Sequence, residues 1–372
     1  MITPCSVVRF GRSGNRDFSE TDIEKYLQSS DLKKIQEAFK QNERPLECRS
    51  CWEKESLGIP SLRIPEAPAT LNSAWQFTEI HLKLNSVCNF KCRMCGPYSS
   101  TAWQQENRAH GASLEGTYDI DKIVSAQHLL GNDKNRRDLF ERVIPNTRLI
   151  RISGGEPLLS AESLEFFREL IARGLNEKHF LLFTNLSSLT FAGVFYPDFW
   201  KQFPKLRLIV SCDGAGASVE YSRTGLRWQD FLKNLQLVRD RIRNVNCVVN
   251  IYSIYSIPEL VRLCFEYNID VHIEPVFREE MSVQILPLSE KLKIKDHYDK
   301  FMASSANEHL PKEIMAKMYS SVNNLLFAED LSSGALPRVF KARNEALDFR
   351  RGTRFSATFP DLAGWYGSIS MA

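Results

Sequence analysis

The sequence predicts an α/β fold, a partial barrel of six strands and their helices, on three observations. Short apolar runs rich in β-branched residues recur from residue 79 onward, and amphipathic segments with helical spacing separate them. The runs are nearly continuous in hydrophobicity, which is typical of parallel strands covered on both faces. Strands alternating with helices in this way indicate parallel βαβ units.

The elements follow in a regular order. We expect strands at 79–85, 148–153, 179–185, 206–212, 246–252 and 269–275. Helices are expected around 22–41, at 160–173, 229–243 and 257–267, and after the last strand at 289–304 and 311–326. The first connection, 85–148, holds one helix and then a polar insertion at 109–146 that exceeds ordinary loop lengths. We therefore expect an N-terminal segment at 1–70, an α/β core at 75–288 and a helical extension at 289–372.

The composition is that of a folded protein with no strong charge bias. The 372 residues are 43% hydrophobic and 25% charged, which excludes a disordered chain and suffices for a large core or two domains. A net charge of +3 with both signs mixed gives no basic electrostatic field of the kind that nucleic-acid binding usually needs. The chain has no apolar run of membrane-spanning length and no apolar signal region, so we expect a cytoplasmic protein without a membrane partner.

The nine cysteines are the unusual part of the composition. An odd number without a signal region argues against disulfides and for free thiols, metal ligands or catalysis. Cys247 and Cys264 lie in apolar runs, and Cys212 ends a strand beside polar neighbours. We interpret these three as packing residues, because free cysteine is commonly a small buried hydrophobe. The other six need a chemical explanation.

Three of those six stand in one run directly after the first expected strand. In LKLNSVCNFKCRMCG the spacing of Cys88, Cys92 and Cys95 is C-x3-C-x2-C. The loop opens at the carboxyl ends of the strands, where sites of α/β folds are built. Three clustered thiolates favour a soft metal centre. A structural zinc ion takes four protein ligands, whereas three thiolates suit a cubane iron–sulfur cluster with one iron left open.

This run, with Phe90 inside it, resembles the signature of radical S-adenosylmethionine (SAM) enzymes. The resemblance implies the partial (β/α)6 barrel of that type and a [4Fe-4S] cluster whose open iron chelates SAM. It implies reductive cleavage of SAM to methionine and a 5′-deoxyadenosyl radical that abstracts hydrogen from a substrate. A reducing partner such as flavodoxin or ferredoxin would supply the electron. Because the cofactor supplies the radical, we assign no side chain as catalytic acid or base.

A second motif follows the second expected strand. It is SGGEP, in which Gly154 and Gly155 let the backbone approach a ligand closely, and the carbonyls and Glu156 can accept hydrogen bonds from an ammonium group. A plain turn would explain the two glycines but not Glu156 and Pro157. The element resembles the family's GGEP turn, which implies contacts to the SAM amino group.

Polar residues also end the later strands. Ser211 and Asp213 form an element that resembles the family's S-x-D-G, which implies hydrogen bonds to ribose hydroxyls. Arg223 would pair with the SAM carboxylate, with a surface arginine as the alternative interpretation. The remaining candidates lie at the ends of the third, fifth and sixth strands, and a structural role is the alternative for the last two: Asn185, Asn250 and Glu274.

Cys48 and Cys51 form a C-x2-C pair ahead of the core. Alone, such a pair predicts a zinc knuckle or a redox site, and joining it to Cys92 and Cys95 gives a zinc ribbon with an overlong gap. The segment PLECRSCWEKESLGIPSLR resembles twitch-type radical SAM proteins, which implies an auxiliary [4Fe-4S] cluster with Cys5 of TPCSVV as the third ligand. That family usually has a further upstream cysteine. Either the cluster has three protein ligands, or the start is truncated, or the cluster is absent.

Two classes of function stay open. The leading hypothesis is a radical SAM enzyme acting on a peptide or protein, with a carbohydrate-like molecule or a nucleobase as the other substrate classes. The alternative is a non-catalytic zinc protein that binds nucleic acid, against which the charge balance and the GGEP element both speak. Residues 346–352 and 358–362 resemble the tail of the same subgroup, and docking on the barrel is their plain interpretation.

Overall fold

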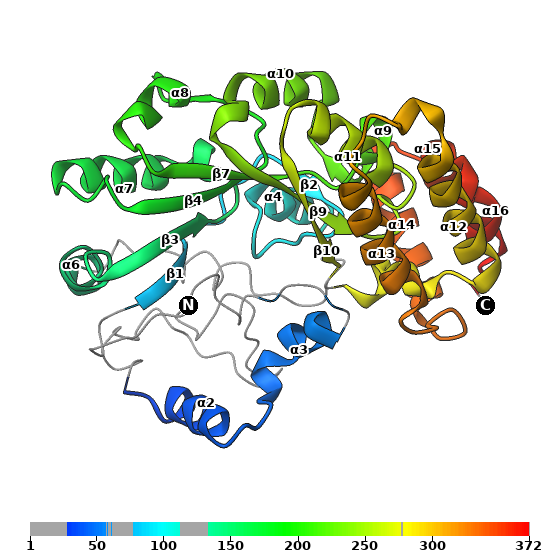
Figure 1. The fold of residues 1–372 in the computed structure, drawn as a ribbon, viewed down its shortest axis with the longest axis horizontal. Helices are drawn as coiled ribbons and strands as arrows, with labels where there is room; N and C mark the ends of the chain where they lie inside the picture. The colour runs from blue at the N-terminus through cyan, green and yellow to red at the C-terminus, as the bar shows by residue number, and fades with distance from the viewer. Residues whose placement is uncertain are drawn as a thin grey trace. The chain divides into compact units, whose positions relative to one another are not determined.

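The computed structural model describes residues 28–56, 58, 61, 77–111, 133–276 and 278–371, and it confirms the predicted α/β fold of a partial (β/α)6 barrel (Figure 1). One six-stranded sheet has the order β1-β3-β4-β7-β9-β10. The pairs β1 with β3, β3 with β4, and β9 with β10 are parallel. The strands span Phe77–Lys83 (β1), Thr147–Ser153 (β3), His179–Thr184 (β4), Leu206–Ser211 (β7), Ile242–Val249 (β9) and Asp270–Pro275 (β10).

Helices connect the strands and follow the last one. The α-helices are α2 (Ser30–Lys40), α3 (Arg49–Ser56), α4 (Thr101–Ala109), α6 (Asp133–Asp138), α7 (Ala161–Ala172), α8 (Tyr196–Phe199), α9 (Gly216–Ser222), α10 (Trp228–Val238), α11 (Ile257–Glu266), α12 (Leu288–Ala303), α13 (Lys312–Phe327), α14 (Leu336–Arg351), α15 (Phe355–Thr358) and α16 (Pro360–Ser368). Two short antiparallel ladders join β2 (Lys91–Cys92) to β8 (Arg223–Thr224) and β5 (Thr190–Phe191) to β6 (Val194–Phe195).

The register of β1 and β3 shows why these segments form buried strands. Ile80 lies opposite Ile150 and Leu82 opposite Ile152, so apolar side chains share one face of the pair. Ile150 and Ile152 are fully buried. The helix α7 begins where the Ser160 hydroxyl accepts a hydrogen bond from the Ser163 N–H. Its buried residues, which include Leu164 and Phe167, lie on one side, as expected for a helix that packs on a sheet.

Some of the sequence expectations need correction. The insertion at 109–146 is not one polar loop in its described part, because α6 and a π-helix at Leu139–Val143 bury Leu139, Phe140 and Val143. The strand expected at 246–252 spans Ile242–Val249 instead, so the helix expected at 229–243 already ends at Val238. The strand ends at Val249 since the Asn250 side chain accepts hydrogen bonds from the N–H groups of the next turn. The helix around 22–41 is seen from Ser30 onward, and residues 22–27 lie outside the described ones.

The chain forms two compact units. The first contains Met1–Asn89, Pro97–Thr184 and Ser188–Leu208, and the second contains Phe90–Gly96, Asn185–Ser187 and Ile209–Ala372. The cysteine run is therefore divided, with Cys88 in the first unit and Cys92 and Cys95 in the second.

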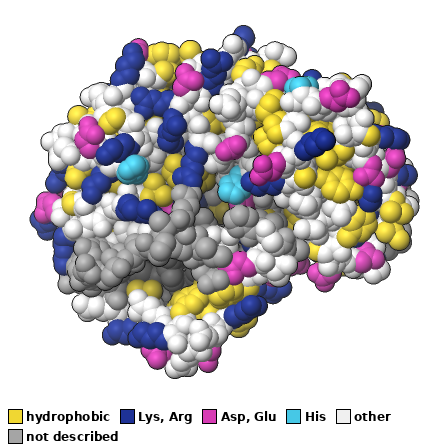
Figure 2. Space-filling model, viewed as in Figure 1, with side chains coloured by type: hydrophobic (Ala, Val, Ile, Leu, Met, Phe, Trp, Pro, Cys, Tyr) yellow, Lys and Arg dark blue, Asp and Glu magenta, His cyan; other side chains and the backbone are white. Residues whose placement is uncertain are grey.

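The end of the chain packs inside the second unit. Phe355 lies 4.8 Å from Phe359 and 4.4 Å from Tyr366 between ring centroids, and Tyr221 of α9 lies 5.1 Å from Phe359. Lys, Arg and acidic side chains all appear on the face drawn in Figure 2. Within the described ranges, none of the helices has both the length and the apolar character needed to cross a membrane.

Candidate functional site

In the first unit, the first turn of α4 holds the backbone of Cys88. The Cys88 N–H donates to Thr101 Oγ1 at 3.2 Å, and the Cys88 carbonyl accepts from the Ala102 N–H at 3.2 Å. The Thr101 N–H donates to the Ser86 carbonyl at 3.0 Å. The Cys88 side chain is half-buried and forms no disulfide. The first cysteine of the run thus has a fixed backbone and an accessible thiol.

The GGEP turn lies directly on the backbone that leads to Cys88. The Gly155 N–H donates to the Asn85 carbonyl at 2.9 Å, and the Glu156 N–H donates to the Val87 carbonyl at 2.5 Å. A Cβ at Gly154 would lie 2.7 Å from the Asn85 carbonyl oxygen, and one at Gly155 would overlap the Val87 carbonyl. Only glycine allows this approach. Two motifs that the sequence singled out separately are therefore in contact.

Glu156 and Pro157 complete the turn. Glu156 is 1% exposed, and its Oε1 accepts from the Leu158 N–H at 3.1 Å and from the Thr184 hydroxyl at 2.9 Å. Pro157 is buried and begins a 3-10 turn at Pro157–Leu159. Because Thr184 ends β4, the carboxylate is fixed at the carboxyl ends of two neighbouring strands.

A polar face of β1 and β3 was missed by the sequence analysis. His81 Nε2 and Ser153 Oγ are 2.7 Å apart, and Arg151 forms an ion pair with Glu79. Burial, helped by Arg151 and Lys83, lowers the pKa of His81 to about 4, so the imidazole is neutral at pH 7. The signal was present in EIHLK, where polar residues occupy every second position of an expected strand.

In the second unit, a short ladder holds the other two cysteines. Cys92 of β2 lies opposite Arg223 of β8, and the Cys95 N–H donates to the Cys92 carbonyl at 3.0 Å. Arg278 donates from Nε to the Met94 carbonyl at 3.3 Å and from Nη2 to the Cys95 carbonyl at 3.4 Å. Cys92 is buried, whereas Cys95 is half-buried. Neither β2 nor β8 was expected from the sequence.

Asp213 and Arg223, which the sequence placed on different parts of SAM, are partners of each other. Arg223 Nε lies 2.7 Å from Asp213 Oδ2, and the Val248 N–H donates to Asp213 Oδ1 at 2.9 Å. Although burial acts to lower it, the pKa of Arg223 is raised above its ordinary value by Asp213 and Cys92. Arg223 is only 8% exposed, so the interpretation as a surface arginine is wrong. Their contacts to SAM stay predictions.

Asn250 and Asn185 both stabilise turns. Asn250 is fully buried, and its Oδ1 accepts from the N–H groups of Tyr252 at 2.8 Å and Ser253 at 3.2 Å. Asn185 Oδ1 accepts from the Ser187 N–H at 2.9 Å. These bonds are the structural roles that such side chains adopt in turns.

Three further candidates, Ser211, Glu274 and Phe90, lie on the second unit. Ser211 is half-buried at the end of β7, and Glu274 is half-buried on β10. Phe90 is 2% exposed. It lies beside Cys92 in sequence and is a core residue of the second unit.

Cys48 and Cys51 are neighbours on one short helical stretch of the first unit. Cys48 ends a 3-10 turn at Leu46–Cys48, and Cys51 lies in α3. They are 8% and 3% exposed and form no disulfide. Residues three apart on a helix share a face, so the two thiols are on the same side. Cys5 lies outside the described residues.

The chemistry of the donor set fits an iron–sulfur cluster. Cys88, Cys92 and Cys95 form no disulfide and two of them are half-buried, and three thiolates are the ligands that such clusters take. Across the part of the chain that the structure describes, no three His, Cys, Asp or Glu side chains gather in a geometry that could hold a metal ion. Cys88 belongs to the first unit, whereas Cys92 and Cys95 belong to the second.

The three isolated cysteines lie where packing residues are expected. Cys212, Cys247 and Cys264 are fully buried. Burial raises the pKa of the Cys212 thiol to about 12, and it also raises the pKa values of Cys247 and Cys264. Thiols that stay protonated in a core are poor metal ligands and nucleophiles.

Comparison with known proteins gives weak structural similarity only. No protein-family model matches the chain, and no curated protein matches it. SuiB from Streptococcus suis is 13% identical over 75% of this chain and 57% of the SuiB chain, with a TM-score of 0.37. Its complex with S-adenosylmethionine aligns with 68% of this chain and 57% of that chain at 13% identity, with a TM-score of 0.36. A structure of TYW1 with a lysine-pyruvate adduct is 14% identical over 73% of this chain and 89% of that chain, with a TM-score of 0.35. At these values the similarity carries no argument about function.

Proposed function

We propose that the protein is a radical SAM enzyme whose cluster binds to Cys88, Cys92 and Cys95. The observation that carries the proposal is the contact between the GGEP turn and the backbone at Asn85 and Val87. It joins, within the first unit, the GGEP turn to the segment that leads to Cys88, the first cysteine of the other motif. Neither motif alone requires the other, and a plain strand-to-helix turn would not need two glycines against these carbonyls.

The residues of the first unit supply a binding site for a cationic amine beside the first cysteine. Turn carbonyls and the fixed Glu156 carboxylate are acceptors for an ammonium group. When bound, the cluster supplies the electron that cleaves SAM. The chain itself has to orient the substrate hydrogen and exclude water, which needs rigid walls and no acid or base. The described cysteines form no disulfide, which favours a reducing compartment such as the cytoplasm.

The test of this proposal is SAM cleavage. Anaerobic reconstitution with iron and sulfide, followed by dithionite and SAM, should yield 5′-deoxyadenosine measured by chromatography. Cys88→Ala, Cys92→Ala and Cys95→Ala should each abolish it, because a cubane held by three thiolates loses a ligand. Cys264→Ala is the matched control and should keep cleavage. A colourless protein with one zinc ion and no acid-labile sulfide would support the zinc-protein alternative instead.

We also propose that the segment 1–70 binds an auxiliary cluster through Cys48 and Cys51, ahead of a core at 75–288 and an extension at 289–372. The support is the pair of buried thiols on one face of a short helical stretch. Cys48→Ala should lose about four irons, the content of one [4Fe-4S] cluster, while keeping a reduced amount of SAM cleavage. Unchanged iron in Cys48→Ala would reject the auxiliary cluster.

For the substrate, we propose a peptide or protein, with flavodoxin or ferredoxin as the electron donor. The support is the resemblance of the Cys48–Cys51 segment to proteins of that kind. Deuterium transfer into 5′-deoxyadenosine identifies the source of the abstracted hydrogen. We expect transfer from a deuterated peptide pool and none from a deuterated carbohydrate pool. The reverse result would replace the peptide by a carbohydrate-like substrate.

A further inference from the structure

Arg93, between the second and third cysteines of the run, points away from the loop into the core of the second unit. It is fully buried. Its Nη1 donates to Asn344 Oδ1 at 2.6 Å, and its Nη2 lies 2.6 Å from Asp348 Oδ1 and 2.8 Å from Thr353 Oγ1. The guanidinium carbon lies 3.7 Å from the centroid of the Tyr221 ring. A single side chain thus ties the cysteine loop to α14 and to the turn that follows it.

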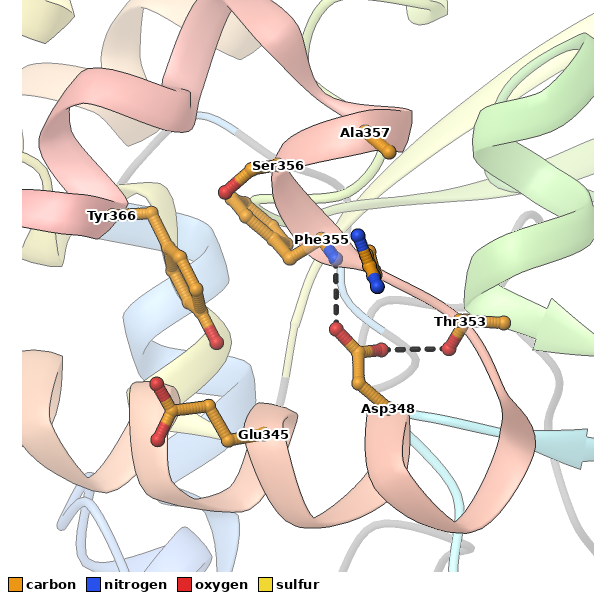
Figure 3. A pocket seen from close by; sticks show the side chains of 8 residues that line it. Glu345, Asp348, Thr353, Phe355, Ser356, Ala357 and Tyr366 are labelled. Atoms are coloured by element: carbon orange, nitrogen blue, oxygen red, sulfur yellow. Dashed lines mark hydrogen bonds between the residues drawn. The ribbon is translucent and has the colours of Figure 1, made fainter.

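Asp348 is held in place independently of Arg93. Its Oδ2 accepts from the Phe355 N–H at 2.7 Å, and its Oδ1 accepts from the Thr353 hydroxyl at 2.7 Å and from Tyr221 at 2.8 Å. Figure 3 shows the bonds to Thr353 and Phe355, at the edge of a pocket of about 460 Å³. The chain reverses at Gly352, which ends α14 with φ of 62°. The anion that meets Arg93 is therefore preorganised.

The loop backbone is held from the same side. The Arg93 N–H donates to the Ser222 carbonyl at 2.7 Å, and the Arg93 carbonyl accepts from Arg343 Nη2 of α14 at 3.2 Å. Arg278 binds the carbonyls of the next two residues, Met94 and Cys95. The backbone between Cys92 and Cys95 is thereby fixed by buried or half-buried charged groups.

We propose that α14 is part of the cluster site: through Asp348 and Asn344 it holds Arg93, and so keeps Cys92 and Cys95 in position before any cluster binds. The cluster in this statement rests on the proposed function, but the positioning of the two thiols does not. The segment ALDFRRG, which the sequence left without a role, contains Asp348. These residues are positioning residues and touch no reactant.

The buried charge of Arg93 explains why loss of Asp348 should affect the loop more than loss of an apolar residue of α14. A guanidinium that loses its counter-ion in the core pays the cost of an unpaired buried charge. The loop can relieve that cost by opening, because Arg93 then reaches water. Loss of Asp348 should therefore favour loop opening. Removal of an apolar side chain of α14 lowers the stability of the unit but does not favour opening of the loop. The packing contacts of that side chain are present whether the loop is closed or open, so the substitution removes them from both states.

The test is the alkylation rate of Cys92 in the metal-free full chain, measured with iodoacetamide and peptide mass spectrometry. Asp348→Asn should raise the alkylation rate about tenfold, and Asp348→Ala should raise it more. A tenfold change corresponds to about 1.4 kcal/mol in the free energy of loop opening. The matched control is Glu345→Gln, which changes a carboxylate on the same helix (Figure 3) but keeps the ion pair of Arg93 with Asp348, and it should leave the rate unchanged. Leu347→Ala removes a fully buried apolar side chain of α14, so it should lower the melting temperature but not free Cys92.

Equal rates in wild type and Asp348→Ala would overturn the proposal, as would an equal increase in Leu347→Ala and Asp348→Ala. Iron release to a chelator after reconstitution is the second measurement. It should be about tenfold faster in Asp348→Ala than in Leu347→Ala, and equal release rates would overturn the role toward the cluster. If the wild type takes up no iron, the proposed function fails, and the alkylation rates still decide whether α14 holds the thiols.

Discussion

Around Cys88 the first unit uses neutral groups, whereas around Cys92 and Cys95 the second unit uses buried and half-buried arginines. The first turn of α4 holds the backbone of Cys88 through hydrogen bonds. The two glycines of the GGEP turn pack against the Asn85 and Val87 carbonyls that precede Cys88. The other end of the run is held by Arg93, Arg223 and Arg278. Neutral contacts fail mainly when a side chain is too large, and charged contacts fail when one partner is removed. The two regions should therefore respond to different substitutions.

The largest effect is expected in the charged region, from Asp348→Ala. It should lower the free energy of unfolding by about 3–5 kcal/mol, because it leaves the buried Arg93 without its counter-ion. Arg93→Ala should cost less, since Asp348 keeps three other donors. Urea unfolding of the two variants measures the difference. Equal costs would remove the asymmetry on which the comparison depends.

In the neutral region the largest effect is steric. Gly155→Ala should destabilise the protein by about 1–3 kcal/mol, because its Cβ would overlap the Val87 carbonyl and the backbone on one side must move. Gly174→Ala is not a suitable control, because Gly174 has a positive φ of 67°. Gly364→Ala in α16 is the matched control, since nothing lies within 4 Å of its Cβ. A stable, fully active Gly155→Ala would show that the turn and the loop do not pack as described.

The polar face of β1 and β3 predicts a dependence on pH. The folded pKa of His81, about 4, lies below the unfolded value near 6.5, so the unfolded state binds more protons between these values. His81 therefore favours folding above about pH 6.5, and this stability is lost as the pH falls toward 4. Between pH 7 and pH 5 the wild type should lose about 2 kcal/mol more than His81→Gln. Parallel pH profiles would contradict this account, because they would mean that His81 has the same pKa in the folded and the unfolded state.

The smallest effect is expected from Thr101→Val. It removes the hydroxyl bonds to the backbone of Cys88 but keeps the amide bonds of α4, so about 0.5–1.5 kcal/mol of stability should be lost. Thr101→Ser keeps the hydroxyl and should restore most of it. A loss as large as that of Asp348→Ala would contradict the distinction between the two regions.

The fold was predictable because its signal is local. The six strands lie close to the apolar runs of the sequence, and the end of β9 has a local reason in the Asn250 side chain. The contact between the GGEP turn and the Cys88 loop was predictable in part, since both follow neighbouring strands. The pairing of Arg93 with Asp348 was not, because the two residues are 255 positions apart and neither has a periodic pattern around it.

The pairing of Asp213 with Arg223 was not predicted from the sequence either, although the two residues are only ten positions apart. Both residues were recognised as functional candidates, but each was given a separate partner on SAM. Sequence patterns name residues that share a region, and only packing shows that the two side chains satisfy each other.

The most direct test of the central claim is a count of iron and acid-labile sulfide after anaerobic reconstitution. It compares the wild type with the variant in which Cys88, Cys92 and Cys95 are all alanine. The wild type should hold about four more irons and about four more sulfides per chain than the variant, the content of one [4Fe-4S] cluster. Equal iron in the two proteins, or zinc without sulfide in the wild type, would contradict the assignment of this cysteine run to a SAM-binding cluster.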